Sequence, residues 1–107
     1  MTVRPPGRHE LPEIDEAGLA AARHAERLLE TARAIGNARW EAFLAPVPER
    51  LRDAPPSDLR VVARRARAAF GPRDSIADVL PWGESMAFRD ALDRLLRLLA
   101  RRDTGER

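Results

Sequence analysis

The stretch from Ser85 to Arg102 is the most strongly patterned part of the sequence. At 100° per residue, its larger apolar residues fall in one arc of about 160°, while arginines and aspartates fill the rest of the circumference. This pattern predicts a long helix around which the rest of the chain packs. The apolar arc is made of Phe88, Ala91, Leu92, Leu95, Leu96, Leu98 and Leu99.

The width of this arc bears on assembly. A peripheral helix in a small bundle needs an apolar face of a little over 100°, so one edge, marked by Leu96 or Leu98, is surplus for a helix with a single neighbour. Either the helix is central and contacts other helices on both edges, or one edge meets a second chain, most simply an identical one in a homodimer. The sequence slightly favours the homodimer, because the other predicted helices are rich in Ala.

The remaining sequence is helical in pattern as well. Aliphatic β-branched residues are scarce, with five Val and three Ile, and no stretch alternates between apolar and polar residues as a strand would. A chain of 107 residues supports one domain with one core. The sequence therefore predicts an all-α fold, a compact bundle of four to five helices over residues 13–103, between a disordered arm (residues 1–12) and a disordered tail (residues 104–107).

Turn and capping residues divide the N-terminal half. The first helix is expected to begin near Ile14 or Asp15 and to end at Gly36 and Asn37, although one continuous helix through these two residues is nearly as compatible with the pattern. A second helix is expected to end at Pro46 and Pro48, and its apolar face is Trp40, Phe43, Leu44 and Val47. One further turn over residues 49–53 would turn Leu51 inward.

The C-terminal half has clearer boundaries. Ser57 is a good N-cap and Gly71 precedes a proline, so a helix is expected over residues 58–70. Ser75 and Asp78 have the spacing of a capping box, which predicts a short helix over residues 75–80. Glu84 or Ser85 is expected to cap the long C-terminal helix.

This order of long helix, short helix, turn and long helix resembles a helix-turn-helix unit, in which the second helix of the pair lies in the major groove of DNA. Two features depart from that pattern. Pro81 stands in the turn, and the helix that would read the bases carries Asp90 and Asp93, which repel phosphate. The C-terminal half is therefore helix-turn-helix-like only.

Positive charge is concentrated in one predicted helix. The net charge of the chain is only +2, and all 19 basic residues are Arg, but residues 57–73 carry five Arg against one acidic residue. Such a cluster favours phosphate. The leading hypothesis is a small non-enzymatic binding protein, a nucleic-acid-associated regulator or accessory factor that contacts DNA or RNA through Arg60, Arg64, Arg65, Arg67 and Arg73.

The alternative is a protein–protein interaction subunit or adaptor with no nucleic-acid role. Val61 points away from the predicted core, and Trp82 lies at a turn where an exposed tryptophan would be a binding hot spot. Together with the surplus leucines of the last helix they define a candidate interface with a protein partner or a second copy. Its residues are Val61, Trp82, Leu96 and Leu98.

Several other functions lack the residues they require. The chain has no Cys, which excludes disulfides and thiolate chemistry, and the two histidines are not spaced to bind a metal with neighbouring carboxylates. Ser85 lacks the strand that a nucleophile elbow needs. No cofactor, metal or catalytic site is predicted. Because no apolar run resembles a signal peptide or a membrane span, a soluble cytoplasmic protein is expected.

Overall fold

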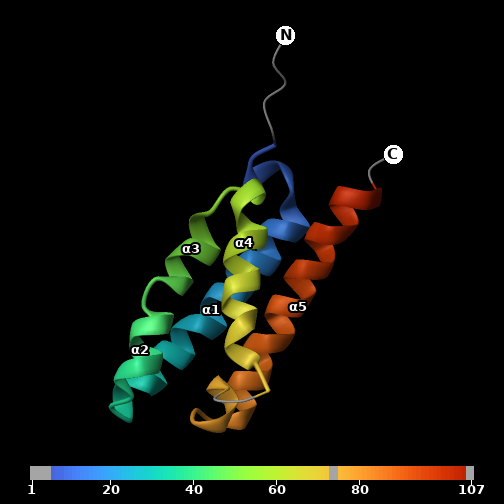
Figure 1. Ribbon diagram of the computed structural model, residues 1–107. Helices are drawn as coiled ribbons and strands as arrows, with labels where there is room; N and C mark the ends of the chain where they lie inside the picture. The colour runs from blue at the N-terminus through green and yellow to red at the C-terminus, as the bar shows by residue number, and fades with distance from the viewer. Residues whose placement is uncertain (1–5, 73–74, 106–107) are drawn as a thin grey trace.

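The structure, a computed structural model, describes residues 6–72 and 75–105. This part of the chain contains no strand, which confirms the all-α class, and it folds into a bundle of five α-helices (Figure 1). The α-helices are α1 (Pro12–Ala34), α2 (Ala38–Leu44), α3 (Val47–Asp53), α4 (Pro56–Arg67) and α5 (Trp82–Gly105). Three short 3-10 helices complete the described chain: η1 (Arg8–Glu10), η2 (Ala68–Phe70) and η3 (Ile76–Asp78).

The two long helices, α1 and α5, run antiparallel along the length of the bundle. The start of α1 and the end of α5 lie at the same end of the molecule (Figure 1), and at the other end the hydroxyl of Thr31 donates a hydrogen bond of 2.8 Å to the carboxylate of Glu84. α3 packs against α1, and α4 packs against both α5 and α3. The molecule is elongated, with extents of 52 × 23 × 18 Å.

The apolar arc of α5 is covered from within the chain. Phe88, Leu92 and Leu95 are fully buried, while Leu96 and Leu98 are partly buried and pack against the same core. α5 is therefore a central helix, which is one of the two arrangements that its wide apolar arc allows. Two helices of the same chain, α1 and α4, pack against α5.

The break between α1 and α2 is confirmed. Gly36 has a φ of +72°, the left-handed conformation that ends many helices. The amide of Asn37 donates to the carbonyl of Ala32 at 2.9 Å, and the amide of Gly36 donates to the carbonyl of Arg33 at 3.1 Å, so these two carbonyls in the last turn of α1 are satisfied. The side chain of Asn37 then caps α2 by accepting a hydrogen bond of 3.0 Å from the amide of Trp40.

Three predicted helix boundaries differ from those in the structure. α1 begins at Pro12, because a proline at the first position needs no intrahelical hydrogen-bond acceptor. The second helix stops before Pro46, and the further turn expected over residues 49–53 forms within α3, but Val47, which was predicted to lie on the second helix, begins α3 instead. α4 begins at Pro56 for the same reason as α1, which places Ser57 inside the helix and not at its cap.

In the C-terminal half, the capping box is confirmed. The Ser75 hydroxyl accepts from the Ala77 amide, and Asp78 accepts from the Ser75 amide at 3.0 Å. The helix it starts is shorter than predicted, since η3 has three residues. α5 begins at Trp82, so Ser85 is a fully buried helical residue and not its cap. The order of a helix-turn-helix unit is kept, but its middle helix is reduced to one turn.

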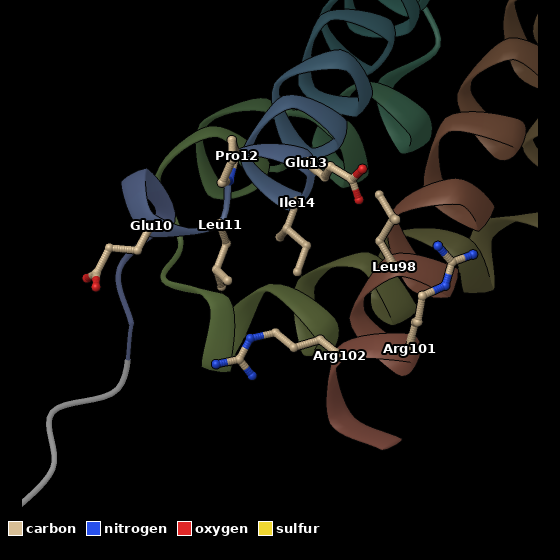
Figure 2. A pocket seen from close by; sticks show the side chains of 8 residues that line it. All are labelled: Glu10, Leu11, Pro12, Glu13, Ile14, Leu98, Arg101 and Arg102. Carbon is tan, nitrogen blue, oxygen red and sulfur yellow. The ribbon is translucent and has the colours of Figure 1, made fainter. Parts of the chain in front are cut away.

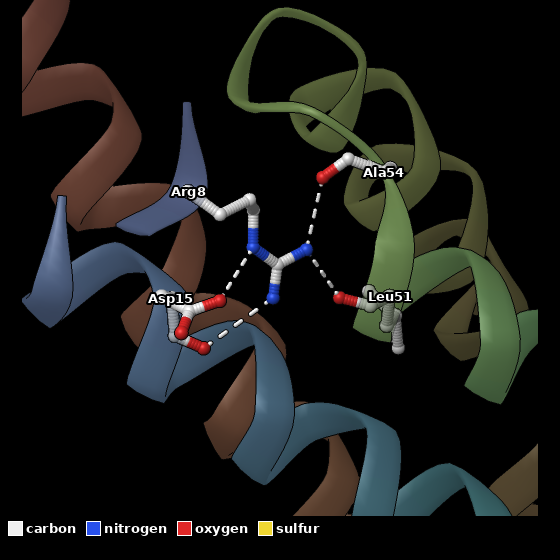
Figure 3. A network of polar contacts seen from close by, with 4 residues as sticks. All are labelled: Arg8, Asp15, Leu51 and Ala54. Atoms are coloured by element: carbon white, nitrogen blue, oxygen red, sulfur yellow. Dashed lines mark hydrogen bonds and ion pairs between the residues drawn. The ribbon is translucent and has the colours of Figure 1, made fainter. Parts of the chain in front are cut away.

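The expectation of an arm without structure up to Pro12 does not hold for residues 8–11. Arg8 is only 12% exposed and inserts between α1 and the end of α3 (Figure 3). Its guanidinium donates to the carboxylate of Asp15 at 2.9 Å and to the carbonyls of Leu51 and Ala54 at 2.8 and 2.9 Å. Leu51 is itself fully buried, as predicted. Residues 1–5 lie outside the described part of the chain.

Candidate functional site

The structure divides the five candidate phosphate-binding arginines into separate groups. Arg67 donates to the carboxylate of Asp93 at 2.7 Å, and its guanidinium lies over the ring of Phe70 at 5.6 Å from the centroid. Arg60 donates to the backbone carbonyl of Leu99 at 3.3 Å. Both side chains therefore join α4 to α5, and their charge is partly used within the protein.

Arg64 and Arg65 are the two candidates that the structure leaves exposed. Neither forms an ion pair or a hydrogen bond through its side chain with any residue in the described ranges. Arg73 lies outside these ranges. Of the arginine cluster predicted from the sequence, Arg64 and Arg65 are thus the members on α4 whose guanidinium groups have no partner among the described residues.

Val61 and Arg65 lie in one groove, although the sequence had suggested different roles for them. The groove runs between α4 and the α2–α3 corner and has a cavity volume of about 110 Å³. Its walls are mainly apolar, and they contain two arginines and no carboxylate. The lining residues are Phe43, Pro46, Val47, Arg50, Val61, Val62, Arg65 and Ala66.

The wall formed by α2 and α3 was missed by the sequence analysis. The sequence predicts Phe43 on the apolar face of the second helix, but its side chain is only partly buried and meets Trp40 edge to face at 5.4 Å between ring centroids. The groove exists because the chain turns at Pro46 between two helices. Pro46 and Pro48 indicate that turn in the sequence. The position of Arg50 at the rim of the groove, however, depends on how α3 packs.

The other predicted interface residues do not join this groove. Trp82 is 68% exposed at the start of α5, and Val61 is 58% exposed on α4, but Trp82 is not among the residues that line the groove. Leu96 packs against the core. Leu98 lines a different cavity, at the end of the bundle where α1 begins (Figure 2).

That second cavity has a volume of about 340 Å³. Leu11 and Ile14 from the start of α1 face Leu98 from α5 across it (Figure 2). Charged side chains surround this apolar floor, two carboxylates from the N-terminal side and two guanidinium groups from the last turns of α5. The lining residues are Glu10, Leu11, Pro12, Glu13, Ile14, Leu98, Arg101 and Arg102.

His24 lines an alanine-rich cavity of about 330 Å³ between α1 and α5, together with Asp90 and Arg94. Burial lowers the pKa of His24, and the neighbouring positive charges of Arg27 and Arg23 lower it further. The imidazole is therefore neutral at pH 7. Among the described residues no three His, Asp or Glu side chains come together in a way that would hold a metal ion.

None of the helices in the described ranges is long and apolar enough to cross a membrane. The chain shows no significant match to any protein-family model, curated protein or solved structure.

Proposed function

We propose that this protein is a protein-interaction module whose docking surface is the groove between α4 and the α2–α3 corner. The observation that supports it is the juxtaposition of exposed Val61 with a mainly apolar cavity and two arginines, Arg50 and Arg65. A contiguous apolar depression with a charged rim is typical of a surface that recognises another protein.

The chemistry of the groove favours one kind of occupant. A volume of about 110 Å³ is smaller than the roughly 300–1,000 Å³ of small-molecule sites, so the groove suits a single large apolar side chain of a partner. Because its lining carries two guanidinium groups and no carboxylate, acidic residues next to that anchor would be favoured. We therefore propose as the partner an acidic amphipathic segment of another protein.

Selection from a random peptide library tests this proposal. The wild-type protein serves as bait, with Val61→Glu as a counter-selection, since Val61 is exposed and its substitution spares the core. Enriched peptides should combine one large apolar residue with flanking Asp or Glu. Their affinity should fall about tenfold or more with Val61→Glu and several-fold with Arg65→Glu.

Arg97→Glu is the matched control for Arg65→Glu, because Arg97 is exposed on α5, outside the groove, and makes the same change in net charge. It should leave peptide affinity within about twofold. Peptides in which the acids are replaced by Lys should bind Arg65→Glu better than the wild type. Enriched peptides that lack acids, or that bind Val61→Glu as well as the wild type, would overturn the proposal.

A nucleic-acid role is the second candidate, and the exposure of Arg64 and Arg65 favours it. Two free arginines that each neutralise a phosphate would give a log–log salt slope of about −2 on a duplex. The double variant Arg64→Ala/Arg65→Ala should then flatten the slope. If no DNA or RNA is shifted at low salt, this candidate fails while the peptide experiment stands unaffected.

The absence of Cys from the sequence is compatible with a reducing compartment, and we propose that the module works in the cytoplasm.

A further inference from the structure

The cavity at the end of the bundle has the size of a small-molecule site and lies apart from the docking groove. Its volume of about 340 Å³ falls within the roughly 300–1,000 Å³ of ligand pockets, and no residue lines both cavities. Its floor is apolar, because Leu11, which precedes α1, and buried Ile14 of α1 face Leu98 of α5 (Figure 2). An apolar body of a ligand would be desolvated there.

The charged side chains around this floor differ in whether they already have a partner within the chain. Glu10 accepts a hydrogen bond from the Gly7 amide at 3.0 Å and lies 3.6 Å from the imidazole of His9. Arg101 and half-buried Arg102 make no side-chain hydrogen bond or ion pair with the rest of the described chain. The cavity therefore offers two available guanidinium groups, while one of its two carboxylates is already engaged.

A guanidinium group binds a carboxylate in a bidentate, planar arrangement that no other side chain matches. The side chain of Arg102 extends from α5, and its guanidinium lies across the cavity from the tip of Leu11 (Figure 2). A ligand that placed its apolar part on Leu11, Ile14 and Leu98 would thus bring a terminal carboxylate to Arg102. Arg101, the preceding residue of the same helix, points its guanidinium to the other side, near Leu98 (Figure 2).

We propose that this cavity binds a small carboxylate with an aliphatic tail. The assignment does not depend on the docking groove or on any protein partner. Glu13 is an exposed carboxylate on the opposite rim, so neutralising it should change the affinity in opposite directions for anionic and cationic ligands. It repels an anionic ligand and would attract a cationic one.

The test is a titration of the full chain with octanoate, in which binding is measured by calorimetry and by the chemical shifts of backbone amides. Octanoate should shift the backbone amide signals of residues 10, 11, 13, 14 and 98–102. Octanol has the tail without the charge, and acetate has the charge without the tail, so both should bind at least tenfold more weakly. Arg102→Ala should weaken octanoate binding about tenfold, the loss of one charge-assisted interaction.

Three further variants separate this site from nonspecific binding. Glu13→Gln should strengthen octanoate binding severalfold, and Leu98→Phe, which fills the cavity from a partly buried position, should abolish it. Arg97→Ala, an exposed arginine on α5 outside the cavity, should leave the affinity unchanged. Equal binding of octanol and octanoate, weaker binding with Glu13→Gln, or chemical shifts confined to other parts of the chain would overturn the proposal.

Discussion

The guanidinium of Arg8 occupies the space that a side chain at position 18 would need. A Cβ atom built on Gly18 would lie 2.6 Å from Nη2 of Arg8 and 3.1 Å from the carbonyl oxygen of Leu51. Gly18 therefore lets α1 approach the end of α3 closely enough for Arg8 to bridge them (Figure 3). Because α3 forms one wall of the docking groove, this contact also supports that wall.

Arg8→Ala should lower the free energy of unfolding by about 2–3 kcal/mol. The substitution removes hydrogen bonds from a charged donor and leaves the part-buried carbonyls of Leu51 and Ala54 without that partner. Urea denaturation followed by circular dichroism measures the change. A loss below about 0.5 kcal/mol would show that the network contributes little.

Gly18→Ala should destabilise the protein by about 1–2 kcal/mol. Overpacking against Arg8 and the Leu51 carbonyl outweighs the gain in helix propensity, which is roughly 1 kcal/mol. Gly83→Ala is the matched control, because that glycine is also helical and a Cβ there meets nothing within 4 Å. The control should be neutral or slightly stabilising in the same urea experiment.

Arg67→Ala should destabilise the fold more than Arg64→Ala. Arg67 bridges to Asp93 and covers the ring of Phe70, whereas Arg64 makes no comparable contact within the described residues. Because the ion pair is about one third exposed on both sides, the expected loss is modest, about 0.5–1 kcal/mol. In a double-mutant cycle with Asp93→Asn, a coupling energy indistinguishable from zero would contradict this assignment.

Leu96→Glu should unfold the chain without first dissociating an oligomer. Leu96 packs against the core of its own chain, so burying a carboxylate there costs stability directly. Light scattering at micromolar concentration, combined with thermal denaturation, measures both properties. A folded monomeric Leu96→Glu obtained from a dimeric wild type would instead support the homodimer that the width of the apolar arc first suggested.

His24 should make stability depend on pH on the acidic side of neutrality. Its pKa in the folded protein is lower than the usual 6.5, chiefly because of burial, so the unfolded chain binds the proton more readily. The free energy of unfolding is therefore unaffected by His24 above about pH 6.5, and it decreases as the pH falls from 6.5 towards the lower pKa that His24 has in the folded protein. His24→Gln should flatten this part of the profile, and an unchanged slope would show that other groups cause it.

The helix content and most turn positions could be predicted because they depend on local chemistry. Gly36 can adopt the left-handed conformation at no steric cost, and Asn37 can cap the next helix without help from distant residues. Ser75 and Asp78 form their capping box within four residues. The apolar arc of α5 likewise specifies a helix that must be covered on a wide face.

The tertiary structure decided which side chains remain available for binding. Arg60, Arg64 and Arg67 share a stripe in the sequence, yet two of them bond to α5 because that helix lies beside α4. Arg8 belongs to a stretch that reads as a frayed arm, and only the proximity of α3 makes it a buried bridge. Such contacts join residues 26 to 46 positions apart, so no local pattern encodes them, and they arise only when the helices pack.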